Sequence, residues 1–296
     1  MQTYSLYVLL AKVVFRLDVL YTGDCERNLQ TGFERELNTS IIDKQTFWQG
    51  LRDFIHDCES PMTIGIQGDW GIGRTSLMNM LRGSGDGEQS GLLDASLCKT
   101  INLNSWPYSQ FDQDDNMVVA CLYALTHELG QALGKESGID AAELKSRLEA
   151  ANSKLIIVLE QIRELWQGRS SNERDGKSYI DISGQMLIFK GEFERLVSLW
   201  TQGGDARRVV IFIDDLDRIH PVMALELLEA IKNFIDVPGC VFVMALDYEE
   251  VQRGMVEKLG VDLQKTSGKA FFDKMIQLLF FLQALSNNKE LVTAAP

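Results

Sequence analysis

The chain has 296 residues, of which 45% are hydrophobic and 24% charged, and its formal net charge at pH 7 is −13. This length and apolar content are enough for one large domain or two small ones with a buried core. The negative charge argues against broad, sequence-independent nucleic-acid binding through a basic surface. The five cysteines are scattered, and we interpret them as reduced thiols rather than disulfides or zinc ligands.

The first forty residues are predicted to form a lead-in of unassigned role, and the main domain is expected over residues 41–296. The apolar start, Tyr4–Val14, has no basic region before it and is interrupted by Lys12 and Arg16. It therefore fits neither a secretory signal nor a membrane span, although a helix lying on a membrane surface is an alternative. We predict a cytoplasmic protein that does not cross a membrane.

Short apolar runs alternate with amphipathic segments along the rest of the chain, a pattern typical of buried strands joined by helices. Strands are predicted at Met62–Ile66, Thr100–Asn104, Val209–Ile213, Cys240–Ala245 and Leu278–Leu282. Helices are predicted at Lys44–Cys58 with Asp43 as cap, Ser76–Leu81, Met117–Leu133, Ala141–Leu165, Phe189–Leu199, Pro221–Asp236, from Tyr248 onward, and Ala270–Ile276. The alternation predicts an α/β fold, with a central, mostly parallel sheet and helices on both faces. Residues 134–204 read as a helical insert, with a polar loop at Gly168–Ser178.

A glycine-rich loop, Gly68–Thr75, follows the first predicted strand and precedes a helix. Its spacing, Gly-x-x-x-x-Gly-basic-Thr, fits a phosphate-binding loop except that position 74 is Arg where the motif has Lys. The successive N–H groups can surround an anion, and the helix adds its positive end. A plain strand-to-helix connector is the alternative for this loop alone. The residues expected to contact a nucleotide are Gly68, Asp69, Trp70, Gly71, Ile72, Gly73, Arg74, Thr75 and Ser76.

Two side chains of this loop are expected to take part in chemistry. The hydroxyl of Thr75 is predicted to bind Mg²⁺, and Arg74 is predicted to bridge the outer phosphates. Arg keeps the charge of Lys, but its guanidinium is wide, planar and forked, whereas an ammonium is a compact point charge. Nucleotide binding is therefore expected to survive this difference more readily than charge stabilisation in the transition state.

Two adjacent carboxylates, Asp214 and Asp215, follow the continuous β-branched run of the strand predicted at Val209–Ile213. Carboxyl ends of parallel strands meet at one edge, so these groups are expected beside the glycine-rich loop. We predict that Asp214 holds the metal and that Asp215 orients or deprotonates the attacking water. The alternative is a solvated acidic turn with an ion pair between Asp217 and Arg218. Arg218 and Lys274 could also act on phosphate, but as surface cations they need no such role.

Together these segments resemble the KAP family of P-loop NTPases, within the AAA+-like and STAND ATPases. The resemblance extends from about Asp43 to Leu282 and includes PMTIGIQGDWGIGRTSLMNML, INLNSWPYSQF, VVIFIDDLDRI and LLEAIKNFIDVPGCVFVMALD, with FFDKMIQLLFFL as a weaker match. It implies ATP as the nucleotide, with Gly68, Gly73, Arg74 and Thr75 in contact with it, Asp214 on Mg²⁺ and Asp215 in hydrolysis. Related folds also keep a γ-phosphate sensor where Asp247 stands, and a helix cap is the competing role for that residue.

Three departures from the family pattern affect the interpretation. Arg74 replaces the Lys, which puts the catalytic rate in doubt. The insert at residues 134–204 is polar and helical, where many members carry membrane helices. The chain stops soon after the last core strand, so the family's helical lid is expected to be missing.

The resemblance implies Mg-dependent binding and hydrolysis of ATP that drive a conformational or assembly switch. Such a switch would act in a homo-oligomer or on a partner effector protein, and the broader group suggests bacterial antiphage defence. The alternative is a nucleotide-binding scaffold with little or no hydrolysis, which Arg74 favours. A third possibility is an interaction protein that has lost nucleotide binding, but the retention of Thr75, Asp214 and Asp215 argues against it.

Overall fold

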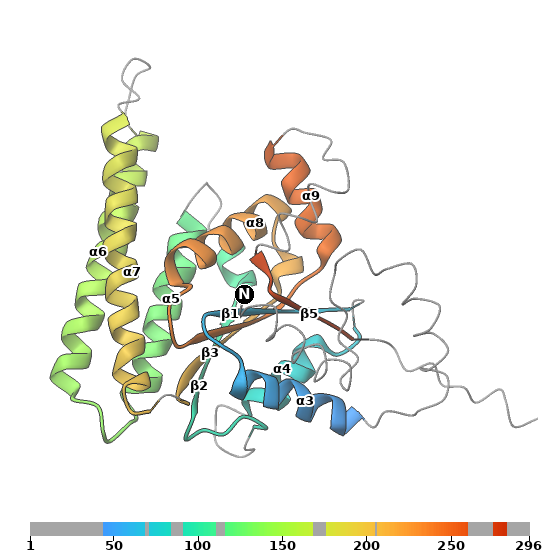
Figure 1. The fold of residues 1–296 in the computed structure, drawn as a ribbon. Coiled ribbons are helices and arrows are strands. Elements are labelled where there is room, and N and C mark those ends of the chain that lie inside the picture. The colour runs from blue at the N-terminus through green and yellow to red at the C-terminus, as the bar shows by residue number, and fades with distance from the viewer. Residues whose placement is uncertain are drawn as a thin grey trace, which may run out of the picture.

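A computed structural model of the chain describes residues 44–68, 71–83, 91–110, 116–167, 176–204, 206–259 and 275–282 (Figure 1). The predicted lead-in, the Asp43 cap and most of the Ala270–Ile276 helix lie outside these residues. All five predicted strands are present: β1 Met62–Gln67, β2 Cys98–Asn104, β3 Arg208–Asp214, β4 Cys240–Ala245 and β5 Leu278–Phe281. They form one sheet in which every neighbouring pair is parallel, which confirms the predicted α/β fold.

The strand order in the sheet is β2-β3-β4-β1-β5. Strand β4 lies between β1, which leads into the glycine-rich loop, and β3, which ends in the acidic pair. Val241 of β4 is opposite Met62 of β1 on one side and Val210 of β3 on the other. Because all the strands run in the same direction, the loop and the acidic residues emerge at the same edge, one strand apart.

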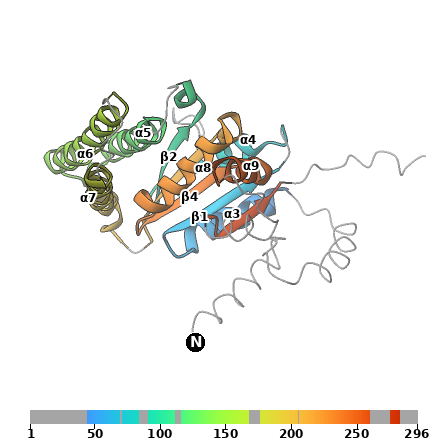
Figure 2. The same cartoon turned by 90° about the horizontal axis from the view of Figure 1, so that it is seen from above.

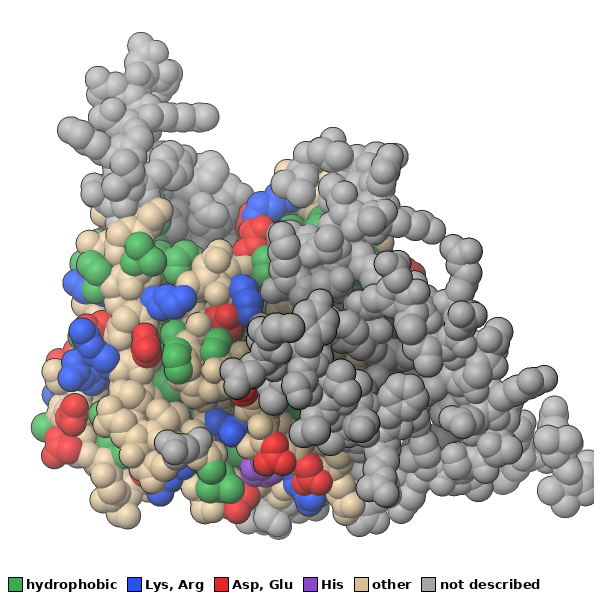
Figure 3. All heavy atoms as spheres, in the orientation of Figure 1, with side chains coloured by type: hydrophobic (Ala, Val, Ile, Leu, Met, Phe, Trp, Pro, Cys, Tyr) green, Lys and Arg blue, Asp and Glu red, His purple; other side chains and the backbone are tan. Residues whose placement is uncertain are grey.

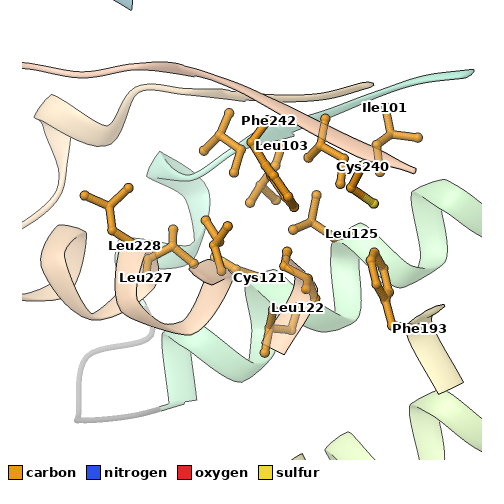
Figure 4. Packing of buried hydrophobic residues seen from close by; sticks show 14 of the residues in the cluster. Ile101, Leu103, Cys121, Leu122, Leu125, Phe193, Leu227, Leu228, Cys240 and Phe242 are labelled. Carbon is orange, nitrogen blue, oxygen red and sulfur yellow. The ribbon is translucent and has the colours of Figure 1, made fainter. Parts of the chain in front are cut away.

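Helices cover both faces of the sheet (Figures 1 and 2). One face packs against α3, Lys44–Asp57, and α4, Arg74–Arg82, which share a buried cluster with Val210 and Phe212. The other face packs against α5, Asn116–Leu133, and α8, Pro221–Ala230, as Figure 4 shows around Phe242. Helix α9, Tyr248–Leu259, belongs to the same side.

Strand β3 is buried on both faces, as its continuous β-branched run predicts. Val209, Ile211 and Ile213 belong to the core on the α5 side, whereas Val210 and Phe212 belong to the core on the α4 side. This double burial fixes the position of Asp214, the last residue of the strand, at the edge of the sheet.

Two long helices, α6, Ala141–Gln167, and α7, Gly176–Thr201, form a hairpin beside α5 (Figure 1). The predicted start of the second helix, Phe189, and the loop prediction for residues 176–178 were wrong, because α7 begins at Gly176. Met186 of α7 belongs to the same buried cluster as Leu155 and Val158 of α6, and this tertiary packing stabilises a helical stretch whose own sequence pattern is weak. Residues 168–175 lie outside the described part. Figure 3 shows hydrophobic, basic and acidic side chains interspersed over this side of the molecule.

One predicted helix has a different ending in the structure. The apolar spacing predicts a single helix from Pro221 to Asp236, but α8 ends at Ala230 and a π-helical turn, Ile231–Ile235, continues it. Ile231 and Ile235 remain buried, so the widened turn keeps the predicted apolar face. No helix within the described ranges is long and apolar enough to cross a bilayer.

Candidate functional site

The glycine-rich loop has the backbone conformation that an anion-binding turn requires. Gly71 has φ 83° and Gly73 has φ 105°, both in the region that favours glycine. The N–H of Leu77 donates to the carbonyl of Gly73 at 2.9 Å, so α4 begins directly after the loop. The first turn of α4 contains no acidic residue. The free N–H groups and positive end of this helix are thus available to an anion.

The start of the loop packs closely against the end of the sheet. A Cβ atom on Gly68 would lie 2.8 Å from Cγ2 of Ile72 and 3.0 Å from the carbonyl oxygen of Leu282. The N–H of Leu282 also donates to the carbonyl of Gln67 at 2.7 Å. These contacts fix where the loop leaves β1. Asp69 and Trp70, which the sequence places in the nucleotide site, lie outside the described residues.

The side chains of α4 that are expected to contact ligand are exposed, whereas its apolar side chains are buried. Thr75 and Ser76, predicted to contact metal and nucleotide, are exposed at the first turn. Leu77, Met78 and Leu81 are buried and fasten the helix to the sheet. This arrangement leaves both hydroxyl groups at the surface beside the loop.

Arg74 is the loop residue whose position the sequence did not predict. It is only 9% exposed, and its Nη2 donates to Oδ2 of Asp217 in an ion pair. Its Nη1 is buried and has no hydrogen-bond partner among the described residues. A buried charged donor with an unmade hydrogen bond is costly, and an oxygen atom of a ligand would remove that cost. The glycine cradle and this free donor therefore fit a phosphate group.

Asp214 is held at the edge of the sheet by its main chain. Its carbonyl oxygen accepts hydrogen bonds from the N–H of Ser105 at 3.2 Å and from Oγ of Ser105 at 2.9 Å. Its own Oδ1 accepts from the N–H of Asp215 at 2.9 Å. Ser105 is fully buried directly after β2, and sequence reasoning missed its role. Asp214 is thus rigidly placed, as a metal ligand needs to be.

Asp215 has a left-handed backbone, with φ 59°, which no other described non-glycine residue shares. A short three-residue 3₁₀ turn, Leu216–Arg218, follows it. Within this turn Arg218 donates from Nε to Oδ1 of Asp215 at 2.7 Å. The predicted alternative, an ion pair between Asp217 and Arg218, was wrong, because Asp217 pairs with Arg74. The guanidinium of Arg218 also lies 5.7 Å from the centre of the Trp106 ring.

Burial raises the pKa of Asp215 above its ordinary value, and the charge of Asp214 acts in the same direction. The charge of Arg218 and a hydrogen bond from Asn104 lower the pKa in part. Asn104 lies opposite Asp214 in the β2–β3 pairing, and no sequence motif indicates that it contacts Asp215. A carboxylate with a raised pKa is a better proton acceptor than a free one, which suits a general base.

The raised pKa predicts how stability depends on pH when Asp215 is replaced by Asn. Because the folded-state pKa lies above the unfolded value, the carboxyl contributes stability at low pH, and this contribution is lost as pH rises through the folded-state pKa. At about pH 7 the ionised carboxylate is therefore unfavourable, and Arg218, which is 47% exposed, offsets little of this cost.

Asp215→Asn is thus expected to raise the melting temperature of the ligand-free protein at about pH 7, and the gain is expected to shrink as the pH is lowered toward about 4. Thermal unfolding, followed by circular dichroism at several pH values in this range, measures the difference in melting temperature between the two proteins. An increase of equal size at every pH would show that turn propensity, rather than ionisation, is responsible.

Asp247 follows β4, between the loop and the acidic turn. Its Oδ1 accepts a hydrogen bond from the N–H of Glu249 at 2.9 Å, and its carbonyl accepts from the N–H of Val251 at 3.2 Å. The residue therefore caps α9, which is the competing role considered from the sequence. Its contact with the γ-phosphate stays a prediction. Lys274 lies outside the described residues.

The structure thus brings the loop of β1 and the acidic turn of β3 together through Arg74 and Asp217. Comparison with protein families gives a match of residues 45–291 to the KAP family P-loop domain. A search of curated proteins finds no match. The family match covers most of the chain and includes the loop, the acidic strand and all five strands of the sheet. The chain therefore belongs to the KAP family of P-loop NTPases.

Proposed function

We propose that the protein binds ATP with Mg²⁺ and hydrolyses it, and that turnover drives a conformational or assembly switch. The observation that carries the proposal is the juxtaposition of a glycine cradle, a buried guanidinium nitrogen with no hydrogen-bond partner in the described part of the chain, and a paired acidic turn. A phosphate chain needs many donors at close range, and hydrolysis needs a base near its end. Family membership supports the same reading.

The residues have distinct roles in the proposed mechanism. The N–H groups of the loop and of the first turn of α4 bind the phosphates, and Nη1 of Arg74 donates to their outer oxygens. Thr75 and Asp214 would hold Mg²⁺, which neutralises phosphate charge when bound. Asp215 accepts the proton of the attacking water, and the raised pKa of its carboxyl favours that transfer.

We further propose that the switch acts within a homo-oligomer or on a partner effector protein, in a cytoplasmic protein of bacterial antiphage defence. The support for this setting is the resemblance to the broader group of STAND and AAA+-like ATPases. A nucleotide-binding scaffold with little hydrolysis is the second candidate. The ion pair between Arg74 and Asp217 favours it, because Asp217 offsets part of the charge that would act on the γ-phosphate.

Thermal unfolding with ATP and Mg²⁺ tests the binding step. At a ligand concentration about 100 times the dissociation constant, binding stabilises the native state by about 2.7 kcal/mol. Each 1 kcal/mol raises the melting temperature by about 2–4 °C for a domain of this size. We therefore expect a clear increase for the wild-type chain. Absence of any increase at saturating ATP and Mg²⁺ would instead support an interaction protein without nucleotide.

Two glycine variants provide the control. Gly73→Ala forces a side chain onto φ 105°, which costs about 1–3 kcal/mol and disturbs the cradle, so its ATP-dependent increase is expected to disappear. Gly191→Ala places the same methyl group in open space on α7, and it should keep the full increase. Equal ATP-dependent increases in both variants would show that the loop does not hold the nucleotide.

A further inference from the structure

We infer that Asp217 is a positioning residue for Arg74: it holds Nη2 of the guanidinium so that Nη1 faces the terminal phosphates of the nucleotide. This inference rests on the proposed function and assigns to Asp217 a role that the sequence did not predict. It also gives a reason for Arg where the motif has Lys.

The ion pair is set inside the protein rather than on its surface. The side chains of Arg74 and Asp217 are 10% and 16% exposed. Removing one partner of such a pair leaves a buried charge, so neither side chain is free to leave without a substitute. Asp217 therefore fixes the guanidinium, since hydrogen bonds to an ionised acceptor are about twice as strong as those between neutral groups.

The guanidinium of Arg74 still has other N–H donors after Nη2 has bonded to Asp217. Arg carries five N–H groups in a planar fork; Nη2 bonds Asp217, whereas Nη1 is buried and has no hydrogen-bond partner among the described residues. Because the fork is rigid, fixing Nη2 also fixes the direction of Nη1. A Lys ammonium could not serve in this way, since its single nitrogen would have to contact both Asp217 and phosphate.

Arg74 begins α4, directly after the cradle of Gly71 and Gly73. Its guanidinium is therefore carried by the residue that directly follows the loop whose N–H groups we propose to bind the phosphates. The expected ligand is the terminal phosphate of a nucleoside triphosphate, since this is the group that the basic residue of such a loop reaches. Asp217 should consequently strengthen the binding of ATP more than the binding of ADP.

The test is a double-mutant cycle on nucleotide preference. Dissociation constants for Mg²⁺–ADP and for Mg²⁺ with a non-hydrolysable ATP analogue are measured by calorimetry in four proteins: wild type, Asp217→Asn, Arg74→Lys and the double variant. We expect Asp217→Asn to reduce the preference for the ATP analogue over ADP by about tenfold in the Arg74 background. In the Arg74→Lys background it should change the preference by less than about twofold, because an ammonium has no fork to orient.

Controls separate positioning from stability. Asp236→Asn removes the carboxylate of another shielded ion pair, Lys232–Asp236, in which the Asp side chain is 12% exposed, and it should leave the preference unchanged. If Asp217 only stabilised the fold, its replacement would lower the melting temperature without changing the preference in either background. If Asp217 instead competed with phosphate for Arg74, its replacement would increase the preference for the ATP analogue.

Either of those two results would overturn the inference while leaving the proposed function intact. Asp217→Ala, which removes the acceptor as well as the charge, should show a larger loss of preference than Asp217→Asn, and the reverse order would also contradict positioning. Failure of the wild-type chain to bind both nucleotides would overturn the proposed function, and the inference with it.

Discussion

Replacing Asp215 with Asn is expected to lower the rate of ATP hydrolysis by about 10²–10⁴-fold, the range that a positioned general base contributes. Asn has nearly the same shape as Asp and tolerates the left-handed backbone at φ 59°, so the turn should persist. An amide cannot accept the proton of the attacking water. Because the change also removes a negative charge near the phosphates, the dissociation constant for ATP should be unchanged or lower.

Phosphate release at saturating ATP and Mg²⁺, together with binding by calorimetry, measures both quantities. Asp94→Asn serves as the control, since Asp94 is an exposed carboxylate that bonds Ser96, outside the proposed site. Equal and brisk rates in wild type and Asp215→Asn would exclude Asp215 as the base. Equal rates at background level, with intact ATP binding, would identify the scaffold function instead.

Replacing Phe212 with Ala should destabilise the protein by about 3–5 kcal/mol, a large share of the 5–15 kcal/mol typical of a folded domain. Phe212 is fully buried in β3, and its cluster includes Met78 and Leu81 of α4. Removing the ring therefore opens a cavity between the sheet and the helix that begins at the glycine-rich loop. Urea unfolding measures the loss as a lower midpoint with a similar slope.

Leu187→Ala is the matched comparison for a large apolar side chain. Leu187 is 64% exposed on α7, and Leu and Ala have similar helix propensities, so the change should stay within about 0.5 kcal/mol. A loss at Phe212 no larger than the loss at Leu187 would show that β3 is not packed as described.

Strands β3 and β4 could be predicted from the sequence because each is a short run of apolar residues with burial on both faces. Val209–Ile213 needs no tertiary information to be recognised as a central strand. The order of strands could not be predicted, since the backbone hydrogen-bonding groups along the edges of β3 can pair with any other parallel strand. The position of β4 between β1 and β3 depends on how the connecting helices pack, and no single segment encodes it.

The candidate site likewise contains features that could be predicted from the sequence and one that could not. The loop and the acidic pair were recognised because their spacing and residue types are themselves the signal. The partner of Arg74 was not recognised, because Asp217 is distant from it in sequence. Asp217 also has an adjacent basic residue, Arg218, which sequence proximity favours as its partner. In a 3₁₀ turn, however, residues three apart lie on the same side, so Arg218 turns back to Asp215 and leaves Asp217 free for Arg74.

The sheet order has a consequence for the synthesis of the chain on the ribosome. Among the described strands, β1 pairs only with β4 and β5, which are made long after it, and Gly68 packs against Leu282, which follows the last of them. At typical elongation rates β1 waits roughly ten seconds or more for these partners. During that interval the glycine-rich loop lacks the contacts that hold it. The chain should therefore bind nucleotide only after Leu282 has been synthesised. Nucleotide binding would then indicate that all of these strands have come together.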